Sequence, residues 1–94
     1  MYNICVKFKC IEGKREAFVK RVRDDGILAA ILAEDGCYRY DYFYSESDPT
    51  ELVLIEAWES LAHQQAHLAQ PHMDTLRSFK GEYITSTEIK EFTI

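Results

Sequence analysis

The sequence predicts an α+β domain with four strands and two helical regions in the order β-α-β-β-α-β. Four segments alternate in polarity or are apolar on both faces, as strands do. Residues 14–34 and 61–79 instead repeat apolar residues every three or four positions, which is typical of helices. The polar turn at 46–50 is short enough to make its flanking strands an antiparallel hairpin. Two right-handed helical crossovers then give the ferredoxin-like split βαβ plan.

The expected strands are residues 2–11, 37–45, 51–58 and 82–93. The third, ELVLIEAW, is apolar along most of both faces, which predicts a central strand covered on both sides. The second, CYRYDYFYS, places every other residue on one face as a row of aromatic side chains: Tyr38, Tyr40, Tyr42 and Tyr44.

The expected helical segments are residues 14–24, 27–34, 61–69 and 71–79. In the first, lysines and arginines are expected on the exposed face. Gly36 ends the second in a left-handed conformation, Ser60 is the expected N-cap of the third, and Pro71 fits the first turn of the fourth.

Both crossovers are expected on one face of the sheet, which leaves the other face without a cover. The apolar third strand and the tyrosine row would then be exposed in a single chain. The sequence therefore predicts a homodimer in which two sheets pack together, with the tyrosine row at the interface. Tyr40 is the one tyrosine that we expect could reach a ligand instead.

Length and composition limit the classes of function. Ninety-four residues form one domain, 1–94, and the net charge of −5 argues against nucleic acid as a partner. No apolar run is long enough for a membrane span, and the N-terminus does not resemble a signal peptide. The odd number of cysteines, without CxxC spacing, indicates reduced thiols and a cytoplasmic protein: Cys5, Cys10 and Cys37.

Residues 56–83 hold all three histidines and most side chains able to do chemistry near neutral pH. His63 and His67 are four residues apart and share a helix face, which raises the question of zinc. The metalloprotease signature needs Glu after the first histidine, where this chain has Gln64. Spacing fixes no third ligand, so we expect no metal site, and His63 is interpreted as an exposed polar residue.

His67 is expected to point toward the sheet among small alanines. Its imidazole could accept a phenolic proton, or it could be a buried histidine bonded to a carboxylate or to backbone. His72 follows Pro71, and it either caps and packs the helix start or binds substrate.

Glu56 lies in an apolar strand and shares a face with Trp58. A buried carboxylate must be paired or protonated, so Glu56 is expected either to pair with Arg39 or Arg77, or to act as a general acid or base. Trp58 is interpreted as a core residue that is compatible with an aromatic wall of a ligand pocket.

Two stretches, EDGCYRYDYF and IEAWESLAHQQAHLAQPHM, together resemble the antibiotic biosynthesis monooxygenase family, and most closely the small bacterial quinol monooxygenase type. The residues that match the family pattern are Glu56, Trp58, His67, Pro71 and His72. The resemblance covers nearly the whole chain. It implies a dimeric α+β barrel and the oxidation of an electron-rich aromatic by O₂ without metal or flavin.

The haem-degrading branch of this superfamily has an Asn, a Trp and a haem-ligating His at positions that hold Val6, His67 and Arg77 here. Asn3 lies three residues too early to replace the Asn, so haem chemistry is not expected.

The leading hypothesis is a cofactor-free monooxygenase for a quinol-like or polyphenolic molecule. In this hypothesis His67 is the base, Glu56 or Arg39 orients it, Trp58 forms a wall, and Tyr40 and His72 contact the substrate. The alternative is a small-molecule-binding or stress-associated dimer of the same fold without oxygenase turnover.

Overall fold

A computed structural model describes residues 1–92 of the chain. It confirms the ferredoxin-like plan and divides each helical crossover into two helices. The elements are β1 (Tyr2–Cys10), α1 (Arg15–Asp24), α2 (Ile27–Leu32), β2 (Cys37–Tyr44), β3 (Glu51–Trp58), α3 (Leu61–Leu68), α4 (Pro71–Lys80) and β4 (Ile84–Phe92).

Most boundaries lie within two residues of the expected ones, and residue 93 lies outside the described part. The hydroxyl of Ser60 accepts a hydrogen bond from the backbone N–H of His63, as a helix cap does. Gly36 has a φ of 77°, and a Cβ at this position would lie 2.5 Å from Cδ2 of His63. The turn before β2 therefore needs glycine both for its backbone and for the packing of His63.

The four strands form one antiparallel sheet in the order β2-β3-β1-β4. β3 is an internal strand, as its two apolar faces predicted. Its register places Glu56 between Tyr40 of β2 and Ile4 of β1. Side chains opposite one another on neighbouring strands share a face, so Glu56 and Tyr40 lie together on the inner side of the sheet.

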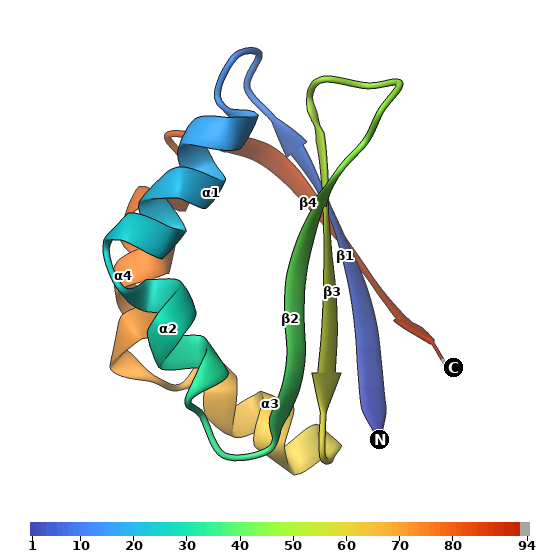
Figure 1. Ribbon diagram of the computed structural model, residues 1–94, viewed down its shortest axis with the longest axis vertical. Coiled ribbons are helices and arrows are strands. Elements are labelled where there is room, and N and C mark those ends of the chain that lie inside the picture. The colour runs from blue at the N-terminus through green and yellow to red at the C-terminus, as the bar shows by residue number, and fades with distance from the viewer. Residues whose placement is uncertain (93–94) are drawn as a thin grey trace.

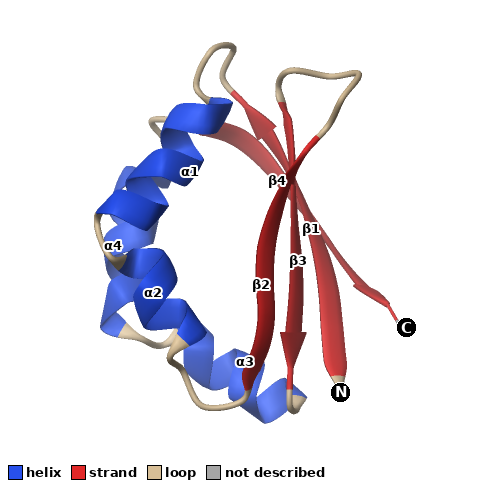
Figure 2. Cartoon of the chain, viewed as in Figure 1, coloured by secondary structure: helices blue, strands red, loops and turns tan. Residues whose placement is uncertain are grey.

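All four helices lie on one side of the sheet (Figures 1 and 2). The core fills the space between these two layers, with Phe18 of α1 and Trp58 of β3 almost fully buried. Among the described residues, no helix has the length and apolar character needed to cross a membrane.

The tyrosines of β2 correct one expectation. Tyr40 is 5% exposed, and it and Tyr42 pack in the core beneath the helices instead of forming a dimer interface. Alternation determines which residues share a face, but it does not determine which face the helices cover. The uncovered face instead carries Arg39, Asp41 and Phe43, which pair in register with Ala57, Ile55 and Val53 of β3.

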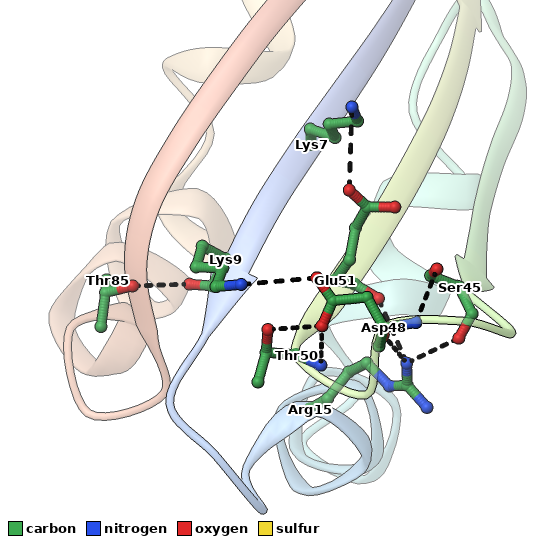
Figure 3. A network of polar contacts seen from close by, with 8 residues as sticks. All are labelled: Lys7, Lys9, Arg15, Ser45, Asp48, Thr50, Glu51 and Thr85. Carbon is green, nitrogen blue, oxygen red and sulfur yellow. Dashed lines mark hydrogen bonds and ion pairs between the residues drawn. The ribbon is translucent and has the colours of Figure 1, made fainter.

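Arg15 is a second departure, because arginines of α1 were expected on its exposed face. Its side chain is only 11% exposed. Its Nη1 donates to three backbone carbonyl oxygens of the β2–β3 turn, those of Ser45 (3.2 Å), Asp48 (3.0 Å) and Glu51 (3.3 Å). Figure 3 shows this guanidinium beneath the turn, where Asp48 also accepts hydrogen bonds from Thr50.

Replacing Arg15 with methionine should lower the free energy of unfolding by roughly 2 kcal/mol, since charged hydrogen bonds contribute about that much. The apolar stem stays and the three carbonyls lose their donor. Urea unfolding followed by circular dichroism measures the change. Arg23→Met is the matched control, because Arg23 lies on the same helix with a side chain 61% exposed, and it should change stability by less than about 0.5 kcal/mol. Equal losses in the two variants would contradict a stabilising role for the Arg15 contacts.

Candidate active site

A cavity of about 190 Å³ lies between the inner face of the sheet and the helices. Pockets for drug-sized ligands usually start near ~300 Å³, so this one suits a molecule of one or two rings. Its apolar lining comes from the sheet and from α1, α3 and α4: Ile4, Val6, Phe8, Phe18, Leu54, Leu68, Met73, Leu76 and Ile89. Its polar lining is Tyr40, Tyr42, Glu56, Gln64, His67, Arg77, Lys80 and Thr87.

His67 reaches the cavity from the last turn of α3 and is 1% exposed. Its Nδ1 lies 2.8 Å from Oε2 of Glu34. A carboxylate only accepts hydrogen bonds, so Nδ1 carries the proton and Nε2 carries a lone pair. Within residues 1–92, no side chain or backbone group hydrogen-bonds this Nε2. The ring lies 4.6 Å from the ring of Trp58 and 5.7 Å from that of Tyr40, which fixes its orientation.

Burial lowers the pKa of His67 below its ordinary value, and the hydrogen bond that His67 donates to Glu34 only partly opposes this. The ring is therefore neutral at pH 7. A neutral imidazole with a free Nε2 can accept a proton from a bound phenol.

Glu56 also lines the cavity, and burial raises its pKa to about 7. The indole N–H of Trp58 donates to its Oε1 at 3.0 Å, which opposes the rise. The negative charge of Glu34 adds to the rise. Glu56 is thus a carboxyl group that can gain or lose a proton near neutral pH, as a general acid or base requires.

The expected pairing of Glu56 with an arginine is wrong. Arg39 bonds Asp41 at 2.7 Å on the uncovered face of the sheet, because its register partner is Ala57 and not Glu56. Arg77 lines the cavity but donates to Asp74 and to the backbone oxygen of Leu68, each at 2.8 Å.

Glu34 is a site residue that sequence reasoning missed. It lies in the turn between α2 and β2, and its Oε2 contacts both Nδ1 of His67 and Nε2 of His72, the latter at 2.7 Å. Only the tertiary fold brings it there, 33 residues before His67, so no local spacing could find it. His72 lies on the outer side of this contact, in a groove separate from the cavity.

The structure thus brings Tyr40, Glu56 and His67 together at one cavity. Trp58 is buried behind them as a core residue and is not among the cavity-lining residues. Four polar residues of the cavity were not expected there: Tyr42, Gln64, Lys80 and Thr87. Helical spacing could have found Gln64, which lies three residues before His67 on α3.

Comparison with known proteins agrees with this architecture. The profile of the family described as antibiotic biosynthesis monooxygenase matches residues 1–77. The chain is 38% identical over 67 residues to the Escherichia coli K12 protein named "Probable quinol monooxygenase YgiN". That match covers 62% of this chain and 64% of the relative, which is less than two thirds of the relative's length.

Solved structures of similar proteins cover nearly the whole chain. Rv0793 from Mycobacterium tuberculosis has a TM-score of 0.83 at 26% identity, covering 99% of this chain and 93% of its own. A Nitrosomonas europaea protein whose name assigns it to the antibiotic biosynthesis monooxygenases has a TM-score of 0.87 at 26% identity, covering 99% and 88%. The chain therefore belongs to the antibiotic biosynthesis monooxygenase family.

Proposed function

We propose that this protein oxidises a quinol-like or polyphenolic molecule of one or two rings with O₂, without a resident metal or flavin. The observation that carries the proposal is the free Nε2 of His67 at an apolar cavity that also holds the carboxyl group of Glu56. The name of the Escherichia coli relative supports the substrate class.

In the proposed reaction, His67 Nε2 accepts the proton of a phenolic hydroxyl, and the resulting phenolate transfers one electron to O₂. The aryloxyl radical and superoxide then combine to form a carbon–oxygen bond. Loss of water from the peroxide leaves an oxygenated quinone, so that quinol and O₂ give hydroxyquinone and H₂O.

The other side chains assist this chemistry. Glu34 stabilises the imidazolium that forms when His67 accepts the proton. Glu56, with a pKa of about 7, is placed to exchange a proton with the second oxygen of the substrate or with the peroxide. The apolar lining keeps water from the phenolate.

Oxygen uptake with a panel of benzoquinols, naphthoquinols and catechols tests the proposal, with the protein-free oxidation rate subtracted. We expect accelerated uptake for at least one compound, with one atom of ¹⁸O₂ in its product. Quenching of the Trp58 fluorescence reports binding in the same samples. Binding without any acceleration over the protein-free rate would identify a ligand-binding protein and not an oxygenase.

We also propose a homodimer formed through the uncovered face of the sheet. This face exposes Phe43 (45% exposed) beside the half-buried Val53 and Ile55. It also holds Asn3, whose buried Oδ1 has no hydrogen-bond partner among the described residues. A second copy would cover the apolar side chains and could satisfy this oxygen.

Light scattering should give twice the chain mass of 11.0 kDa. Ile55→Lys should reduce this to the mass of one chain, because it places a charge in the apolar interface. Leu32→Lys, at an exposed position of α2, should leave the mass unchanged. A wild-type chain that is monomeric at micromolar concentration would overturn the dimer.

A further inference from the structure

Two hollows lie on opposite sides of the Glu34–His67 contact. The first is the cavity, which His67 lines. The second is an outer groove of about 350 Å³ lined by Glu34 and His72, with Asp35, His63 and Gln70 and the small side chains Ala30, Ala33 and Ala66. The exposed fraction of the side chain rises from 2% for His67 to 9% for Glu34 and 20% for His72. The three residues therefore lead from the interior to the groove.

The same three residues present three potential ligand atoms to one point. Oε2 of Glu34 lies 2.8 Å from Nδ1 of His67 and 2.7 Å from Nε2 of His72, and all three atoms lie within 4.8 Å of one another. The residues come from the α2–β2 turn, from α3 and from α4. Two imidazole nitrogens and one carboxylate oxygen are a ligand set that zinc and its neighbours in the transition series accept.

We propose that Glu34, His67 and His72 bind a divalent cation of the Zn²⁺ class, with a fourth coordination position open to the outer groove. Tetrahedral bonds of about 2.0–2.2 Å place ligand atoms roughly 3.3 Å apart, so the two present contacts must each widen by about half an ångström. Asp35 also lines the groove, with its Oδ2 3.3 Å from Nε2 of His63, and its carboxylate adds a negative charge that attracts a cation.

Metal binding would change the tautomer of the His67 ring, and with it the protonation of the nitrogen that faces the cavity. In the hydrogen-bonded state Nδ1 carries the proton, and Nε2 is an acceptor. A metal needs the lone pair of Nδ1, so the proton of the neutral ring moves to Nε2. Nε2 then donates and can no longer accept a phenolic proton. A cation bound from the groove would thus inhibit the proposed oxidation in the cavity. This inhibition rests on the proposed function, whereas the metal site itself does not.

Calorimetric titration of chelator-treated protein with Zn²⁺ alone tests the site. We expect one Zn²⁺ per chain. Glu34→Gln and His72→Ala should each weaken binding by roughly 10²-fold or more, since loss of even an outer-shell partner costs about 10–100-fold. His63→Ala, which removes a histidine of the same groove, should leave the affinity nearly unchanged. Absent binding, or equal binding by Glu34→Gln and wild type, would overturn the site, and so would loss of binding in His63→Ala.

Two spectroscopic measurements test the geometry without any enzyme assay. Co²⁺ should give the intense visible absorption of a four-coordinate site in wild type and not in His72→Ala. The ¹⁵N resonances of His67 should move from the Nδ1–H to the Nε2–H tautomer when Zn²⁺ is added, and unchanged resonances would contradict ligation by this ring. Zn²⁺ should slow quinol oxidation by wild type. If no quinol is oxidised, only the proposed function fails, because these measurements still decide the metal site.

Discussion

Replacing His67 with alanine is expected to lower the turnover of a quinol substrate by roughly 10²-fold or more, the usual scale for loss of a general base. Its Nε2 is the free nitrogen of a neutral ring, because Glu34 engages Nδ1 and burial lowers the pKa of the ring. Steady-state oxygen uptake, corrected for protein-free oxidation, measures the loss.

A buried histidine can also matter for packing, since removing it opens space beside Trp58. His67→Gln is therefore the second variant, because glutamine keeps a polar side chain near Glu34 but has no basic nitrogen. Thermal melts establish that both variants are folded, and both should be slow. His63→Ala is the matched control, since His63 bonds Ser60 outside the cavity and should keep wild-type turnover. A folded His67→Gln protein with full activity would remove His67 from the mechanism.

Sequence patterns predicted the elements of the fold because the physical causes of those elements are local. The two apolar faces of β3 predicted an internal strand, and the Ser60 hydroxyl predicted the start of α3. The same patterns did not predict which face of the sheet the helices cover. Alternation placed Tyr40 and Tyr42 together, but only the packing of the helices determines that they are buried.

The residues of the candidate site show the same difference between what local sequence predicts and what only tertiary packing determines. Glu56 and His67 were predicted because a carboxylate in an apolar strand and a histidine among alanines are locally unusual. Glu34 and the buried contacts of Arg15 could not be predicted, because their partners are distant in sequence. Arg39 was paired wrongly with Glu56, because it lies with Asp41 on the face of β2 that the helices leave uncovered, and Glu56 lies on the other face of the sheet.

The pH dependence of stability should report the raised pKa of the Glu56 carboxyl group directly. Its pKa is about 7 in the folded chain, against an ordinary value of 4.5. Below pH 4.5 the carboxyl group is protonated in both folded and unfolded chains. Between pH 4.5 and 7 the unfolded chain loses this proton while the folded chain keeps it, so the free energy of unfolding falls as pH rises. The shift corresponds to roughly 3 kcal/mol, lost by about pH 8.

Glu56→Gln should abolish this loss of stability with rising pH, because glutamine still accepts the hydrogen bond of the Trp58 indole but has no proton to lose. The free energy of unfolding of the variant, measured relative to that of wild type, should rise by roughly 3 kcal/mol from pH 4.5 to pH 8. The variant should therefore be the more stable protein at pH 8. Urea unfolding at fixed protein concentration across this range measures the difference, in which the other titrating groups cancel. Glu88→Gln, at an exposed position of β4, should follow the wild-type curve at every pH. If the free energy of unfolding of Glu56→Gln also changes with pH as that of wild type does, then Glu56 is ionised in the folded protein at neutral pH and cannot supply a proton in the cavity.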